Sequence, residues 1–366
     1  MTKPCVFGHL PQESALFMLD SNMNTLPIIV PARNEEEAIE STLYSFSRAA
    51  EHFCDENLGT RVIVILCDNG SSDGTHSKVL SCASALRTDR FEIVLINELQ
   101  RGKMHALLKA IGHLRSLNLN SPVVVFADAE IQWDSDTLSE LWKYWRTVQG
   151  EADLVAAKIE RNRTGPENIW EALESVFYIG YGQGFQGHGE FARLAMGMTY
   201  LCDARVLPRF FKIPTESGNE DLAISYLVGR SRIHVCPTAR VKYTVCNTMG
   251  MFFKVKGRHV RENYRLQNWI AKRIFLRLPQ RRQHLLAYIF CYLRAQTILA
   301  GFVENRTLHY AIGHQTHFRE IASPKRFFVL IFLMTPVYTI LKFSARYDLM
   351  FGKAKAGWLP YRHSHK

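Results

Sequence analysis

The sequence predicts an α/β protein with a mostly parallel sheet flanked by helices, followed by a basic and hydrophobic helical C-terminal region. Short apolar runs rich in β-branched residues recur through the first part of the chain, and longer helical patterns separate them. Near-continuous apolar runs are typical of parallel strands that are buried on both faces. Right-handed crossovers then bring the loops after these strands to one edge of the sheet, where open α/β sheets bind ligands.

Each expected element follows from its local pattern. The apolar runs predict strands at residues 26–30, 61–66, 91–96, 123–127, 154–159 and 195–201. Asn34 is expected to be the N-cap of the first helix, because three glutamates follow it and acids favour a helix N-terminus. Asp73 is the expected N-cap of the second helix. Further helices are expected at residues 103–116, 137–148, 167–180 and 220–228, with a glycine- and aromatic-rich loop at 180–189.

Composition limits the class of protein. With 366 residues, 47% of them hydrophobic and 22% charged, the chain is neither disordered nor fibrous. Its 45 basic and 34 acidic residues give a net charge of +11, which suggests an anionic partner such as a nucleotide, a nucleic acid or a phospholipid surface. Nucleic acid is not expected, because the cations cluster beside apolar segments and no nucleic-acid-binding motif is recognised.

The eight cysteines and the N-terminus indicate the compartment. No Cys-x-x-Cys pair occurs and several cysteines lie in apolar runs, so we expect buried free thiols in a reducing compartment. The first 25 residues have no basic start leading into an apolar stretch, so no secretory signal is expected. These observations predict a cytoplasmic protein.

The C-terminal region, residues 249–366, combines cations with apolar segments. Residues 251–283 hold ten basic residues and one acid, a local charge of +9 (ten minus one). The apolar segments 285–303 and 327–341 are interrupted by Arg294 and Pro336, and both are short or broken for a spanning helix of about 20 apolar residues. They are either buried core helices or a helical pair at a membrane interface. Their continuity with the basic run favours membrane association, and spanning stays open.

Polar side chains follow the expected strands. Asp68 comes at a strand tip, where a nucleobase N–H or a ribose hydroxyl can be bound. The motif at residues 30–36 (VPARNEE) is a strand exit; its glutamates repel phosphate, so any nucleotide contact there is expected with the base or ribose. Lys103 follows Gly102 at a helix start, where an ammonium and free N–H groups can face a phosphate, although such a lysine is usually solvated.

Two further groups of residues carry possible chemistry. Asp128 and Glu130, at i and i+2 after a strand, are expected to point the same way from an extended backbone and to hold a divalent cation together with phosphate oxygens. The alternative is a pair of surface acids. Residues 218–222 (GNEDL) begin a short helix, where an acid either caps the helix or acts as a general base. Arg258 and Arg261 share one helix face, suited to a diphosphate or to a solvated or lipid-facing surface.

Together and in this order, these motifs resemble family 2 glycosyltransferases of the GT-A fold. The resemblance covers roughly residues 26–265 and rests on VPARNEE (30–36), CDNGSSDGT (67–75), RGKMHAL (101–107), DAE (128–130), GNEDL (218–222) and RHVRE (258–262). It implies an N-terminal extension at residues 1–25, a GT-A domain at 26–248 and the helical region after it. It also implies Mg²⁺ or Mn²⁺ on Asp128 and Glu130, and Asp221, beside Glu220, as the catalytic base. The implied nucleotide-sugar site contains Pro31, Ala32, Arg33, Asn34, Glu35, Asp68, Lys103, Asp128, Arg258 and Arg261.

Three departures from the family pattern bear on the reaction. Asn69 replaces the usual second aspartate of the second motif, and Glu130 replaces the usual aspartate of the metal motif. Glu262 stands where processive synthases have the tryptophan of Gln-x-x-Arg-Trp, so transfer of a single sugar is expected.

The resemblance therefore predicts an inverting enzyme that moves a sugar from a nucleotide diphosphate donor to a hydroxyl or phosphate. A lipid-linked acceptor of cell-envelope synthesis is expected, reached at the cytoplasmic face of a membrane. Two alternatives are a sugar-phosphate nucleotidyltransferase and a non-catalytic nucleotide- or lipid-binding protein of the same fold. The first needs a glycine-rich loop after the first strand, and residues 30–36 contain no glycine.

Overall fold

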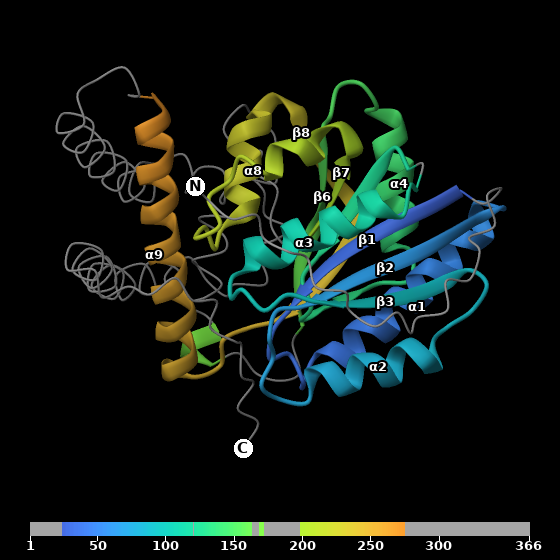
Figure 1. The fold of residues 1–366 in the computed structure, drawn as a ribbon, viewed down its shortest axis with the longest axis horizontal. Helices are drawn as coiled ribbons and strands as arrows, with labels where there is room; N and C mark the ends of the chain where they lie inside the picture. The colour runs from blue at the N-terminus through green and yellow to red at the C-terminus, as the bar shows by residue number, and fades with distance from the viewer. Residues whose placement is uncertain (1–23, 120, 163–167, 172–197, 275–366) are drawn as a thin grey trace, which may run out of the picture.

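The computed structural model describes residues 24–119, 121–162, 168–171 and 198–274 (Figure 1). Within these residues, one sheet of eight strands has the order β3-β2-β1-β4-β7-β6-β8-β5. The strands are β1 Asn24–Ala32, β2 Thr60–Asp68, β3 Phe91–Asn97, β4 Val123–Ala127, β5 Ile131–Trp133, β6 Leu154–Asn162, β7 Thr199–Asp203 and β8 Ile233–Thr244. The helices include α1 Ile39–Glu56, α2 Thr75–Ala85, α3 Lys103–Ser116, α4 Thr137–Thr147, α7 Leu207–Phe210, α8 Glu220–Val228 and α9 Met249–Ile274.

The first half of the sheet is parallel. Strand β1 pairs in parallel with β2 and β4, and β2 pairs in parallel with β3. Strand β7 is antiparallel to both β4 and β6, while β8 runs parallel to β6. The predicted α/β fold with a mostly parallel sheet is confirmed, and the carboxyl ends of β1, β2 and β4 meet at one edge.

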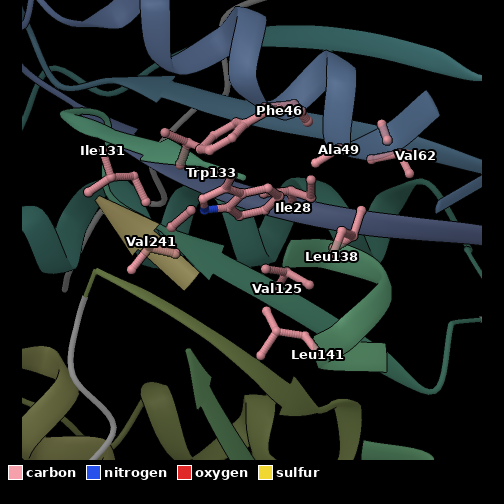
Figure 2. Packing of buried hydrophobic residues seen from close by; sticks show 14 of the residues in the cluster. Ile28, Phe46, Ala49, Val62, Val125, Ile131, Trp133, Leu138, Leu141 and Val241 are labelled. Carbon is pink, nitrogen blue, oxygen red and sulfur yellow. The ribbon is translucent and has the colours of Figure 1, made fainter. Parts of the chain in front are cut away.

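Side-chain alternation along the strands builds one core on each face of the sheet. Ile28 and Val30 of β1 pack with α1, α2 and α4, whereas Ile29 packs with α3, α7 and α8. Figure 1 shows α1 and α2 on one side of β1–β3 and α3 on the other. In the first core, the Trp133 ring lies 4.2 Å from the Phe46 ring, centroid to centroid (Figure 2). This packing on both faces explains why the strands read as continuous apolar runs.

Both predicted N-caps are wrong. Helix α1 begins at Ile39, several residues after Asn34, which has a left-handed φ of 55°. Asparagine tolerates this conformation better than most residues, so it suits the turn that leaves β1. Helix α2 has Gly74 as its N-cap, and the Asp73 carboxylate accepts a hydrogen bond from the N–H of Thr75 at 3.1 Å.

Several predictions fall on other parts of the chain. The loop at 180–189, most of the helix expected at 167–180, and both apolar segments, 285–303 and 327–341, lie outside the described residues. None of the helices that the structure describes is long and apolar enough to cross a membrane. The six cysteines within the described residues are free and buried, as predicted.

Candidate active site

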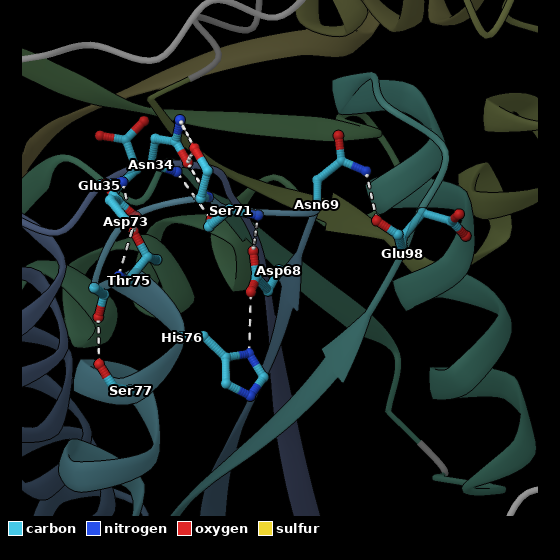
Figure 3. A network of polar contacts seen from close by, with 12 residues as sticks. Asn34, Glu35, Asp68, Asn69, Ser71, Asp73, Thr75, His76, Ser77 and Glu98 are labelled. Carbon is cyan, nitrogen blue, oxygen red and sulfur yellow. Dashed lines mark hydrogen bonds and ion pairs between the residues drawn. The ribbon is translucent and has the colours of Figure 1, made fainter.

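The loops after β1 and β2 interlock at the carboxyl edge of the sheet (Figure 3). The Asn34 side chain accepts a hydrogen bond from the N–H of Ser72 at 2.7 Å, and the N–H of Asn34 donates to the Ser71 hydroxyl at 3.0 Å. The N–H of Glu35 donates to the Thr75 hydroxyl at 2.8 Å. The first two sequence motifs therefore form one rigid platform, although about 40 residues separate them.

Asp68 is held by contacts to both of its carboxylate oxygens. Its Oδ1 accepts the N–H of Ser71 at 3.0 Å, and its Oδ2 lies 3.0 Å from Nδ1 of His76 (Figure 3). The Asp68 side chain is only 6% exposed, so its orientation at the end of β2 is fixed. His76 is a contact that the sequence did not reveal, because its pairing depends on how α2 packs.

Asn69 explains one departure from the family pattern. Its amide donates to the carbonyls of Glu98 and Gln100 at 3.1 and 2.7 Å, and its Oδ1 accepts the N–H of Gly102 at 2.7 Å. An ionised aspartate has no donors for the two carbonyls. Asn69 therefore clamps the β3–α3 loop and sets the direction from which Lys103 enters the site.

Lys103 joins two carboxylates from separate elements. Its Nζ lies 2.7 Å from Asp128 Oδ1 and 2.6 Å from Glu220 Oε1, and all three side chains are less than a quarter exposed. Burial lowers the pKa of Lys103, but Asp128, Glu220 and Asp221 raise it by more. Burial also raises the pKa of Glu220 to about 7 even though Lys103 opposes this change. One ammonium therefore lies among three carboxylates and offsets only part of their charge.

A second carboxylate cluster adjoins Asp128. Glu35 is 4% exposed, and its Oε2 has no hydrogen-bond partner among the described residues. Burial raises the pKa of Glu35 well above its usual range, and Glu130 and Asp128 raise it further, while Arg258 opposes them. Asp128 directly follows β4, whereas Glu130 lies in the turn before β5, so the chain between them does not continue the extended backbone that was predicted. Within the described residues, no three His, Cys, Asp or Glu side chains form a complete metal-ligand set.

The remaining residues of the first motif occupy different positions. Pro31 and Ala32 are buried in β1, opposite Cys67 and Asp68 of β2. Arg33 is 8% exposed. Burial lowers the pKa of Arg33, Arg101 lowers it further and Asp68 opposes them. Its guanidinium therefore lies in the field of both residues, and Arg101 joins the site although the sequence did not single it out.

Helix α9 brings cations to the same region. Arg258 is close enough to Glu35 to oppose the rise of its pKa. Burial lowers the pKa of His259 well below its usual range, and nearby cations, including Lys103, add to the effect. Arg261 is partly exposed one turn further along the helix. Of these residues, Arg258 lies close enough to influence a carboxylate at the end of the sheet.

Tyr200 of β7 is a site residue that no sequence motif indicated. It is 1% exposed, and its hydroxyl has no hydrogen-bond partner among the described residues. Burial raises the pKa of Tyr200 well above its usual range, and the largest contribution from a charged neighbour is that of Glu220. The ring stacks on Phe126 with centroids 5.1 Å apart. Asp221 and Asp128 also raise the pKa of Tyr200, so the phenol lies beside the Lys103 cluster.

Acids, a buried lysine and arginines thus gather at the carboxyl edge of the sheet, where open α/β folds bind their ligands. Residues 28–204 match the family described as "Glycosyl transferase family 2". The matched residues therefore form a family 2 glycosyltransferase domain. No curated protein sequence is significantly similar to it.

Two solved structures are similar to this chain. The mannosyltransferase PcManGT from Pyrobaculum calidifontis, in complex with GDP-Man and Mn²⁺, aligns over 91% of this chain and 89% of its own, with a TM-score of 0.56 and 18% identity. TarS 1–349 from S. aureus aligns over 90% of this chain and 92% of its own, with a TM-score of 0.45 and 15% identity. The first likeness establishes the GT-A fold.

Proposed function

We propose that this glycosyltransferase moves a single sugar, with inversion, from a nucleotide diphosphate-sugar to an acceptor hydroxyl or phosphate. The observation that carries the proposal is the meeting of Lys103, Asp128 and the first turn of α8 at one point, next to the platform that holds Asp68. The platform suits the nucleoside, with Asp68 accepting a base N–H. The cluster suits the diphosphate and the reacting sugar.

The carboxylates around Asp128 fit a divalent cation. Asp128 and Glu130 both raise the pKa of Glu35, and one buried Glu35 oxygen has no hydrogen-bond partner among the described residues. Such a set fits Mg²⁺ or Mn²⁺ when diphosphate oxygens and water complete the coordination. In this proposal Asp128 and Glu130 hold the ion, which supplies positive charge to the leaving diphosphate. The presence of GDP-Man and Mn²⁺ in the similar mannosyltransferase supports this assignment.

Asp221 is the proposed general base. It follows Glu220, whose carboxylate is engaged by Lys103, and it is itself partly exposed at the N-terminus of α8. As the acceptor oxygen attacks the anomeric carbon, Asp221 takes its proton. The bond from that carbon to the diphosphate oxygen breaks, and its electron pair stays with the diphosphate. Arg258, Arg261 and Lys103 offset the charge that develops there.

Hydrolysis of donor by the purified chain tests the reaction class. We expect one nucleotide to be released from a panel of UDP-, GDP- and TDP-sugars with Mn²⁺, and a chelator to stop the release. Asp128→Asn is expected to reduce the rate by about 10²-fold or more, because the ion would lose a carboxylate ligand. Asp136→Asn is the matched control, since that carboxylate is exposed and makes no side-chain cap at α4. Release that persists without metal, or in Asp128→Asn, would contradict the metal assignment.

We also propose a lipid-linked acceptor of cell-envelope glycan synthesis, reached from the cytoplasmic face of a membrane. The support is the charge of +9 in residues 251–283, of which Lys254 is an exposed member on α9. Clustered cations attract anionic lipid surfaces at about 1 kcal/mol each.

Vesicle sedimentation tests the membrane proposal. The full chain is expected to sediment with vesicles containing anionic lipid, and to be released by high salt. A chain ending at Gln283 should bind more weakly, because it lacks both apolar segments. Equal recovery of the full chain in the supernatant, with and without vesicles, would favour a soluble glycan acceptor.

A further inference from the structure

A close contact joins α9 to the loop that precedes α8. Glu262 of α9 is 6% exposed, and its Oε2 accepts a hydrogen bond from the N–H of Gly218 at 2.9 Å. Asn219, the N-cap of α8, makes no side-chain cap hydrogen bond. The entry to α8 is therefore held by an acid that lies 44 residues further along the chain.

The Glu262 side chain lies close against the backbone at Gly218. A Cβ at residue 218 would lie 2.7 Å from Glu262 Cδ and 2.8 Å from its Cγ, so that the Glu262 side chain would have to move away. The need for glycine here comes from the close approach of Glu262, because Gly218 does not have a positive φ. The two residues thus form a matched pair.

A third residue fixes the Glu262 carboxylate. Arg265, one turn later on α9, donates from Nη1 to Glu262 Oε1 at 2.9 Å, and the two side chains are 17% and 8% exposed. Each carboxylate oxygen therefore has its own donor. Charge-assisted hydrogen bonds of this kind are strong and directional, so the rotamer of Glu262 is defined.

From this geometry we propose that Glu262 is a positioning residue, which sets where the first turn of α8 presents Asp221 to the reacting atoms. Asp221 lies three residues after Gly218, and the other anchor of this turn is the contact of Glu220 with Lys103. Arg258 lies four residues before Glu262, on the same face of α9. One face of α9 therefore holds Arg258 near the carboxylates and also holds, through Glu262, the loop that leads to Asp221. The inference rests on the role proposed for Asp221.

A double-mutant cycle tests the inference, with donor hydrolysis as the readout. Glu262→Ala is expected to lower kcat at least tenfold with less than a threefold change in donor KM, because small misplacements of a reacting group are costly. Gly218→Ala should cause a similar loss by displacing the Glu262 side chain. In the Glu262→Ala background, Gly218→Ala should add almost nothing, because the added methyl group then meets open space.

Two further variants separate positioning from general damage. Glu262→Gln keeps a carbonyl acceptor for the Gly218 N–H and should retain most of kcat. Glu92→Gln removes a carboxylate on β3 that pairs with Arg61 and Arg87. This variant should leave kcat and donor KM unchanged. Multiplicative losses in the double variant, or a kcat for Glu262→Ala equal to that of the wild type, would overturn the inference.

The cycle is also read by thermal unfolding, so that the two proposals fail separately. An inactive wild-type chain, or an active Asp221→Asn variant, would overturn the proposed function. In either case the contact between Gly218 and Glu262 is still tested by the melting temperatures of the variants. A drop caused by Gly218→Ala that vanishes with Glu262→Ala supports the matched pair, and an equal drop in both backgrounds rejects it.

Discussion

Asp221→Asn is expected to lower donor hydrolysis and sugar transfer by about 10²- to 10⁴-fold, the range that a positioned general base contributes. Asparagine has the same shape and can still accept the N–H of Leu222, which Asp221 Oδ1 accepts at 2.8 Å. The start of α8 should therefore be undisturbed. The melting temperature and its rise with nucleotide diphosphate and Mn²⁺ should match those of the wild type.

The pH profile gives a second readout of the same variant. A general base is active when ionised, so the wild-type rate should fall as the pH drops through the pKa of that base. The small residual rate of Asp221→Asn should lack this limb. Asp136→Asn is the control for replacing an exposed acid at a helix start, and its rate should be normal. A rate for Asp221→Asn within threefold of the wild type would remove the role assigned to Asp221.

Lys103→Met is expected to destabilise the metal-free fold by about 3–5 kcal/mol at pH 8, because it leaves buried carboxylates without their counterion. Methionine keeps the length of the side chain, so lost packing contributes little. The free energy of unfolding is measured by urea denaturation. Lys143→Met is the control, because Lys143 pairs with Glu56 and Glu140 at an exposed surface and should show no measurable change.

The free energy of unfolding lost in Lys103→Met should depend on pH in a defined direction. The folded-state pKa of Glu220 is raised from 4.5 to about 7, so between these values the folded protein binds more protons than the unfolded chain. Stability from this group is therefore greatest at low pH and falls as the pH rises. Lys103 lowers the pKa of Glu220, so removing it should deepen the fall. A Lys103→Met defect as large at pH 5 as at pH 8 would contradict this account.

The sequence predicted six of the eight strands that the structure describes, all but β5 and β8, because those six stand out as local apolar runs. Strands β1 to β4 and helices α3 and α8 were found from runs of apolar residues and from helix starts. The positions of Asp68 and Asp128 at strand ends followed from the same pattern, since parallel strands bring their carboxyl ends to one edge. The family was predicted from the order of several motifs, each of which is weak alone.

The turns were predicted less well. Asn34 and Asp73 have the residue types of N-caps, yet neither occupies that position. The Asn34 side chain instead accepts the N–H of Ser72 in the loop after β2, and the Asp73 carboxylate accepts the N–H of Thr75, the first residue of α2. Local propensity cannot distinguish a cap from such a bridge, because both use the same acceptor groups.

Hydrogen bonds and ion pairs between residues far apart in the sequence were decided by the tertiary structure. The sequence predicted Lys103 as a phosphate ligand, and packing places it between Asp128, which follows β4, and Glu220 of α8. Asn69 and Glu262 read as departures from a family pattern, yet one clamps the β3–α3 loop and the other holds the loop before α8. Periodicity determines which face of an element is buried, but hydrogen bonds and ion pairs act over about 3 Å. Which polar groups come that close depends on how the sheet, α3, α8 and α9 pack together.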